Sequence, residues 1–187
     1  MVALIAAGCA QRVNVEAPSS EAVMPAMNEL HEVIIKQVVM GYVDGGGMAP
    51  VVILANKENN EQFIPIWVGL AEGKSIDMAL NKHISERPGT HDLFASVLGK
   101  FRMNMVRVVV SDLRESTYFA VITMESNGVM KEIDSRPSDA IAMALRFSTP
   151  IFVSEEVIQK SGWIETLQKG EEDKESSDEE EDSGNLL

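Results

Sequence analysis

Two short segments of the chain each place an arginine before a proline and an aspartate shortly after it. Residues 87–93 read Arg-Pro-Gly-Thr-His-Asp-Leu, and residues 134–140 read Asp-Ser-Arg-Pro-Ser-Asp-Ala. Proline disfavours helical geometry in the residue before it, so Arg87 and Arg136 are expected to be extended just outside a helix start. A guanidinium in that position is suited to binding phosphate through two parallel hydrogen bonds. The two segments together could hold two points of one phosphate backbone.

The predicted helix starts add further phosphate-binding groups. Thr90 and Ser138 are typical N-cap residues, so the sequence places the two helix starts at these positions. The first N–H groups of a helix lack intrahelical partners and, with the positive end of the helix dipole, attract anions. We therefore predict a phosphate site formed by Arg87, Arg136, Thr90 and Ser138.

Carboxylates in the same segments would repel a phosphate, which indicates that a cation lies between them. Asp134 and Asp139 flank Arg136, and Glu72 lies near the start of an earlier predicted helix. Mg²⁺ and Mn²⁺ bind carboxylates, bridge to phosphate and activate water for attack on a phosphodiester. We predict Asp134 and Asp139 as ligands of such a divalent metal ion, with Glu72 as a third acid that joins them and takes part in catalysis.

His91 and Asp92 are predicted to move protons at this site. His91 is the only one of the three histidines in such a cluster, and an imidazole acts as general base or acid near neutral pH. Asp92 would then orient it. A structural interpretation competes with this one, because aspartates in the first turn of a helix, such as Asp92 and Asp139, stabilise it by ~0.3–1 kcal/mol. Arg87 and Arg136 could equally form structural ion pairs, and His91 could serve in capping or packing.

The elements that must position these residues resemble two copies of one strand–strand–strand–helix unit. In the first copy, strands are expected at 32–40, 50–55 and 63–68, followed by a helix at 71–82. In the second copy, strands are expected at 103–110, 118–123 and 129–133, followed by a helix at 138–146. A turn at 112–116 separates the first two strands of the second copy. Apolar residues recur in the same order in both helices, which favours a duplication.

We expect an α+β fold in which the duplicated β-β-β-α unit forms a mixed, barrel-like sheet with helices packed on it. Three further elements complete the expected fold. They are a helix at 90–101 between the copies, a strand at 149–153 and a helix at 154–159 with Ser154 as its N-cap. Trp67 is expected in the core, and Trp163 is expected to cover the core from the last helix. The helix at 90–101 has its apolar residues on one face, namely Leu93, Phe94, Val97, Leu98 and Phe101.

Composition and charge narrow the class of protein. The chain has 187 residues, of which 45% are apolar, enough for the core of one domain. Its net charge is −13, and nine acids and one lysine between residues 171 and 182 account for −8 of this. The remaining −5 excludes the global basic surface of a high-affinity binder of duplex DNA. A single cysteine excludes an intrachain disulfide, and no stretch is long and apolar enough to span a bilayer.

Both ends of the chain are expected to lie outside the folded domain, which we place at residues 28–169. Residues 170–187 are too rich in Glu, Asp and Ser to bury a core, so they are predicted to be a disordered acidic tail. Residues 1–27 are predicted to be a disordered extension or a signal remnant. The run before Cys9 resembles the end of a lipoprotein signal without its basic residues, and the alternative is a true start at Met24 or Met27. The protein is therefore expected to be cytoplasmic, or lipid-anchored through Cys9 if a longer signal precedes it.

Three motifs in this order resemble the bifunctional nuclease domain family of bacteria and plants. They are residues 64–69, Ile-Pro-Ile-Trp-Val-Gly, followed by Glu72; residues 87–93; and residues 134–142, the most specific of the three. The resemblance covers residues 30–157 and implies a compact α+β fold, a homo-oligomer and nuclease activity on DNA and RNA. The site residues that it implies are Glu72, Arg87, His91, Asp92, Asp134, Arg136 and Asp139. Gly73 stands where an alanine is usual, and we expect it to loosen the helix start beside Glu72.

The leading hypothesis is a metal-assisted nuclease that hydrolyses phosphodiester bonds of DNA and RNA with low sequence specificity. The alternative is a non-catalytic regulatory module that binds nucleic acid or protein, in which the Arg/Asp pairs are structural. A third hypothesis is that the acidic tail mimics nucleic acid and restrains the arginine sites.

Overall fold

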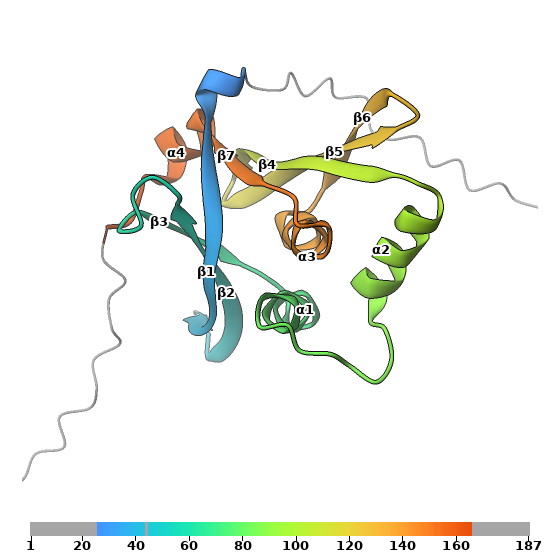
Figure 1. Ribbon diagram of the computed structural model, residues 1–187. Coiled ribbons are helices and arrows are strands. Elements are labelled where there is room, and N and C mark those ends of the chain that lie inside the picture. The colour runs from blue at the N-terminus through green and yellow to red at the C-terminus, as the bar shows by residue number, and fades with distance from the viewer. Residues whose placement is uncertain (1–25, 44, 166–187) are drawn as a thin grey trace, which may run out of the picture.

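The computed structural model describes residues 26–43 and 45–165, in which seven strands and four α-helices follow a short 3₁₀ helix at Met27–Glu29 (Figure 1). The strands are β1 (Leu30–Val43), β2 (Gly47–Asn56), β3 (Phe63–Trp67), β4 (Asn104–Arg114), β5 (Thr117–Ser126), β6 (Val129–Ser135) and β7 (Ile151–Ser154). The helices are α1 (Leu70–Leu80), α2 (Thr90–Lys100), α3 (Pro137–Phe147) and α4 (Glu155–Ser161). The predictions for Cys9, Met24 and the acidic tail at 170–187 lie outside the described residues.

The strands form one mixed, open sheet in the order β3-β2-β1-β7-β4-β5-β6. The first three strands are an antiparallel meander, and β4, β5 and β6 form a second one. The short β7 lies between them, antiparallel to β1 and parallel to β4. Helix α1 follows the first meander and α3 follows the second, in the order expected for the two units. The fold is α+β.

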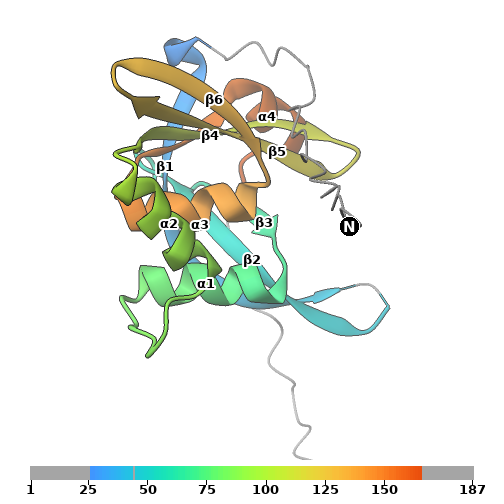
Figure 2. The same cartoon turned by 90° about the vertical axis from the view of Figure 1, so that its right-hand side faces the viewer.

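The predicted barrel-like closure is wrong. Closure would require β3 to pair with β6, and these two strands lie at opposite ends of the sheet. Instead, α1 and α3 lie side by side against one face of the sheet (Figures 1 and 2). Ile76 of α1 and Ile141 of α3 are both fully buried in a core that includes strand residues of both meanders. The helix side chains therefore fill the interior that a closed barrel would enclose.

Most predicted elements lie within a few residues of the observed ones, and two local expectations are wrong. The turn expected at 112–116 is only Glu115 and Ser116, both with positive φ, as a two-residue hairpin requires. Asp112 is consequently a buried residue of β4. Trp67 is 51% exposed, because it ends an edge strand. Its ring lies against Gly41, which has no side chain to displace it. Trp163 is partly buried against the core, as expected, but it lies after the end of α4 and not in that helix.

The helices differ in how much of their surface the core covers. Ala140 to Ala144 of α3 are all buried, whereas only Leu98 of α2 is. The other apolar residues predicted on one face of α2 are exposed, namely Leu93, Phe94, Val97 and Phe101. The final helix begins as predicted, since the Ser154 hydroxyl accepts a hydrogen bond from the Val157 N–H at 3.2 Å.

Gly73 has a packing role rather than the expected loosening effect. It is buried within α1, and its N–H donates to the Gly69 carbonyl at 2.8 Å, so the helix start is regular. A Cβ at this position would lie 2.5 Å from Cβ of Pro50 on β2. The missing side chain therefore allows α1 to approach β2 closely.

Within the described residues, no helix is long and apolar enough to cross a membrane.

Candidate functional site

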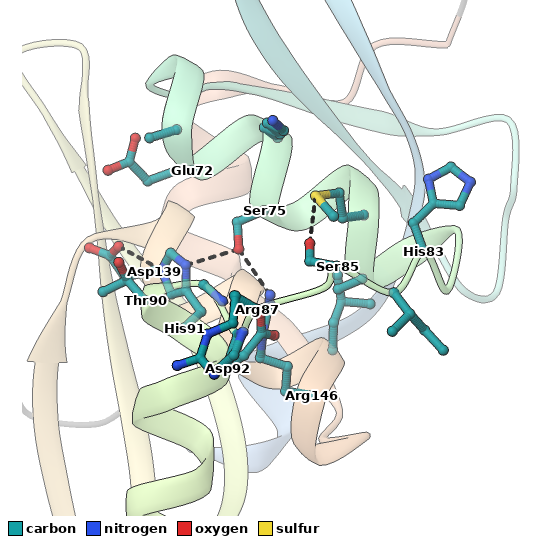
Figure 3. Close-up of a pocket in the computed structure, with 18 of the residues that line it drawn as sticks. Glu72, Ser75, His83, Ser85, Arg87, Thr90, His91, Asp92, Asp139 and Arg146 are labelled. Carbon is teal, nitrogen blue, oxygen red and sulfur yellow. Dashed lines mark hydrogen bonds and ion pairs between the residues drawn. The ribbon is translucent and has the colours of Figure 1, made fainter.

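A cavity of about 880 Å³ lies where α1, α2 and α3 meet (Figure 3). Its walls are one face of α1, the loop before α2, the first turn of α2, and polar residues of α3 together with the residue before that helix. Seven of the nine predicted site residues line it, namely Glu72, Arg87, Thr90, His91, Asp92, Arg136 and Asp139. Asp134 and Ser138 do not.

Arg136 joins the carboxylates at one end of the cavity. Its Nε and Nη2 donate to the two carboxylate oxygens of Asp139 at 2.6 and 3.0 Å, a bidentate ion pair. The same Nη2 donates to Oε1 of Glu72 at 2.9 Å, so one guanidinium links the start of α3 to α1. The Arg136 side chain is nevertheless 66% exposed.

His91 lies at the centre of the network. One ring nitrogen, Nε2, is 3.2 Å from Oδ1 of Asp139, and the other, Nδ1, is 3.0 Å from Oγ of Ser75. These contacts join α2 to α3 and to α1. The His91 side chain is 15% exposed, so it is largely enclosed while still reaching the cavity wall.

Arg146 forms the other end of the network. Its Nη2 donates to Oγ of Ser75 at 3.0 Å, and its Nε donates to Oδ1 of Asp92 at 2.6 Å. Its Nη1 donates to the Ala142 carbonyl within α3 at 2.8 Å. The second oxygen of Asp92 accepts the Gly89 N–H at 2.8 Å, which caps α2. Continuous polar contacts thus run from Glu72 to the start of α2.

The pKa values of two acids of this network, Asp92 and Asp139, lie below the ordinary value. Burial raises the pKa of Asp139, but hydrogen bonds from Arg136 and His91 outweigh it and hold that pKa below its ordinary value. The hydrogen bond from Arg146 lowers the pKa of Asp92 against the opposing effect of burial. The hydrogen bonds to Asp139 and Glu72 in turn raise the pKa of Arg136. The cavity wall therefore holds paired opposite charges.

The helix starts differ from those predicted. Gly89 is the N-cap of α2 and Arg136 is the N-cap of α3, so Thr90 and Ser138 are not N-caps. The reasons are local: Asp92 reaches back to the Gly89 N–H, and a proline after Arg136 is well suited to the first helical position. Thr90 is exposed at the cavity, whereas Ser138 is buried.

The described residues do not fit the predicted divalent metal ion as they are arranged. Asp134 lies on β6 opposite Val121, outside the cavity wall, and so is separated from the cluster that contains Asp139. Glu72 and Asp139 already share the guanidinium of Arg136. Among the residues that the structure describes, no group of three or more His, Cys, Asp or Glu side chains could hold a metal ion.

Ser75 and Arg146 are members of the network that the sequence-based prediction missed. Arg146 lies two helical turns after Asp139, and Ser75 lies one turn after Glu72. Helical spacing therefore places each on the same face as a predicted site residue, and that signal could have found both.

The chain belongs to the bifunctional nuclease domain family. The model of this family matches residues 52–166, which include every residue of the network. Two similar proteins come from Mycobacterium tuberculosis: Uncharacterized protein MT1877 of strain CDC 1551 / Oshkosh and Uncharacterized protein Rv1829 of strain ATCC 25618 / H37Rv. Each is 32% identical over 113 residues, which cover 60% of this chain and 67% of the relative.

Proposed function

We propose that this protein is a nuclease that hydrolyses phosphodiester bonds of DNA and RNA with low sequence specificity. The observation that carries the proposal is the cavity whose wall contains Arg87, Arg136 and Arg146 together with His91. Arginine side chains bind phosphate and stabilise the charge that develops on it, and a histidine can transfer the protons that hydrolysis requires. Membership of the bifunctional nuclease domain family supports the same activity.

Arg87 is the proposed primary contact for the phosphate. It lies in the exposed loop before α2 and lines the cavity. It forms no ion pair with any residue that the structure describes, whereas Arg136 and Arg146 are each paired with carboxylates. The donors of Arg87 can therefore reach a substrate without first breaking an ion pair. A local cation of this kind can bind phosphate although the net charge of the chain is negative.

The divalent metal ion remains a prediction, and the proposal does not require it. An ion at Glu72 and Asp139 would compete with Arg136 for both carboxylates. Cleavage measured with Mg²⁺, with Mn²⁺ and with EDTA therefore separates two forms of the same activity. Activity that EDTA abolishes would favour the metal-assisted form.

A second candidate function is a non-catalytic binding module. The observation in its favour is Arg146, whose side chain is only 12% exposed and links α3 to both other helices of the cavity. Such an ion pair can serve the fold alone. This candidate predicts binding of nucleic acid or protein without any cleavage.

The test compares the full chain with Arg87→Ala and with Lys131→Ala, which removes an exposed cation of β6 outside the cavity. Each protein is purified identically, checked for folding by circular dichroism, and assayed on single-stranded DNA and RNA. Loss of a charged phosphate contact should reduce kcat/KM ~10- to 100-fold in Arg87→Ala and leave Lys131→Ala unchanged. Equal cleavage by both variants would indicate a contaminating nuclease. Binding without cleavage under every metal condition would favour the second candidate.

A further inference from the structure

Three side chains from three helices form a continuous hydrogen-bonded series in the cavity wall. Ser75 of α1 lies 3.0 Å from Nδ1 of His91, and Nε2 of His91 lies 3.2 Å from Oδ1 of Asp139 (Figure 3). A hydroxyl, an imidazole and a carboxylate in this order are the components of an activated serine nucleophile.

The hydrogen-bond partners limit which atom donates and which accepts at each contact of this series. Arginine has only donors, so Oγ of Ser75 accepts the hydrogen bond from Nη2 of Arg146. The carboxylate of Asp139 accepts, so in the ring tautomer that the proposal below requires, Nε2 of His91 donates to Asp139 and Nδ1 keeps a lone pair. That lone pair accepts the single hydroxyl proton of Ser75. The order of the ring nitrogens is reversed relative to the trypsin triad, in which Nε2 faces the serine.

Ser75 also differs from Ser96 and Ser161, two other serines of the helices. A helical serine commonly donates its hydroxyl to the carbonyl four residues earlier. Ser96 of α2 does so at 2.7 Å, and Ser161 of α4 does so at 2.9 Å. In the part of the chain that the structure describes, the recorded hydrogen bonds of the Ser75 hydroxyl are those to His91 and Arg146. Its orientation is therefore set by the cavity network and not by its own helix.

The surroundings of Ser75 suit attack on an anionic phosphorus centre. Ser75, Arg87 and Arg146 all line the cavity. The hydrogen bond from Arg146 stabilises negative charge as it develops on the serine oxygen, and Arg87 can hold a non-bridging oxygen of the phosphate. No metal ion is needed to generate a nucleophile in this arrangement.

We propose that Ser75 is the nucleophile of this cavity and forms a phosphoserine intermediate with His91 as general base. For its substrate class, a phosphodiester, this inference rests on the proposed function. The Ser75 oxygen forms a bond to phosphorus while the bond from phosphorus to the leaving nucleoside oxygen breaks. The serine proton passes to Nδ1 of His91 and then to the leaving oxygen. Asp139 is a positioning residue that holds the ring.

The second half of the reaction restores the serine. Water attacks phosphorus and gives a proton to His91 while the bond between phosphorus and the Ser75 oxygen breaks. His91 then returns the proton to that oxygen. The net change is the addition of one water across one phosphodiester bond.

The test uses a reagent that does not depend on the natural substrate. A tagged fluorophosphonate is added to the full chain, and mass spectrometry locates any label. A labelled serine has gained a bond to phosphorus with loss of fluoride. The label is expected on Ser75 in the unaltered chain and in the matched control Ser96→Ala, and it is expected to be absent in Ser75→Ala. His91→Ala should slow labelling ~100-fold or more, the usual contribution of a general base. If His91→Ala fails to fold, Ser75→Ala alone decides the result.

Cleavage of DNA and RNA is measured on the same samples with Mg²⁺, with Mn²⁺ and with EDTA, so the two proposals can fail separately. The expected result is label on Ser75 together with a loss of cleavage of at least ~1,000-fold in Ser75→Ala. Cleavage without label, or Ser75→Ala that cuts at the original rate, would overturn the nucleophile and leave the nuclease proposal standing. Label on Ser75 without cleavage of either nucleic acid would refute the nuclease and support the nucleophile. Neither label nor cleavage would refute both.

The role of Asp139 has its own readout. Asp139→Ala should slow labelling of Ser75, and Asp139→Glu, which keeps the carboxylate, should restore part of the rate. A purely structural role would change thermal stability without this recovery of the labelling rate.

Discussion

Replacing Arg146 with methionine should destabilise the fold far more than the same replacement of Arg136. The Arg146 guanidinium donates to Asp92 at 2.6 Å, to the Ala142 carbonyl at 2.8 Å and to Ser75 at 3.0 Å, and its side chain is 12% exposed. Breaking a buried ion pair costs about 3–5 kcal/mol. The Asp92 side chain is 42% exposed, so water can solvate its carboxylate in the variant, and the expected loss is about 2–3 kcal/mol. Methionine keeps most of the aliphatic packing, so the loss reports the polar contacts.

Arg136→Met is the matched control. Arg136 also contacts two acids, but its side chain is 66% exposed, and exposed ion pairs contribute little to stability. Urea unfolding of both variants, compared at constant m, gives the two changes in the free energy of unfolding. For a domain of this size, Arg146→Met should also lower Tm by roughly 5–10 °C. Equal losses in the two variants would show that burial does not decide the strength of these pairs.

Three further predictions concern other parts of the fold. A hydrogen bond from Lys160, opposed by burial, lowers the pKa of Asp112 from 3.8 to about 2. Because the folded-state pKa is the lower one, the stabilisation is complete above about pH 4 and is lost as the pH falls toward 2. Asp112→Asn should therefore flatten the decrease in Tm over that pH interval. A decrease in Tm equal to that of the unaltered chain would contradict this. Gly73→Ala should lower stability by about 1 kcal/mol in urea unfolding, since overpacking against Pro50 exceeds the gain in helix propensity, and a more stable variant would disprove the close approach. Phe101→Glu, on the exposed apolar face of α2, should reduce the mass found by light scattering if that face joins the expected homo-oligomer; the same mass as the unaltered chain would exclude it.

The elements of this fold follow from local patterns, whereas their assembly does not. Alternating apolar residues and turn signals locate strands and helices, because these depend on neighbours in sequence. The place of β7 between β1 and β4 depends on pairing between residues far apart, so the open sheet could not be inferred from the repeated unit. The prediction that Trp67 lies in the core was wrong for a similar reason. Strand pairing puts Trp67 on the edge strand β3 and its ring against Gly41 of β1, which is distant in sequence.

The candidate site was partly predictable for the same physical reason. Arginine before proline marks a helix start, and both Arg87 and Arg136 line the cavity in the structure; their role as phosphate ligands stays a prediction. Ser75 and Arg146 precede no proline, and only their helical spacing from Glu72 and Asp139 marks them, because their partners come from other helices. The N-caps were misassigned because a side chain that reaches back from the third helical position, as Asp92 does, can replace a capping side chain at the start.

The order of the elements along the chain has a consequence for when the cavity can first exist during protein synthesis. Ser75 belongs to the first half of the chain, Asp139 and Arg146 belong to α3, and the strand that joins the two meanders ends at Ser154. The N-terminal meander can form as it leaves the ribosome, but α2 and α3, which contribute His91, Asp139 and Arg146 to the cavity, are made after it. Under the proposed function, the residues that contact the substrate are therefore all present only once α3 has been made, at Phe147.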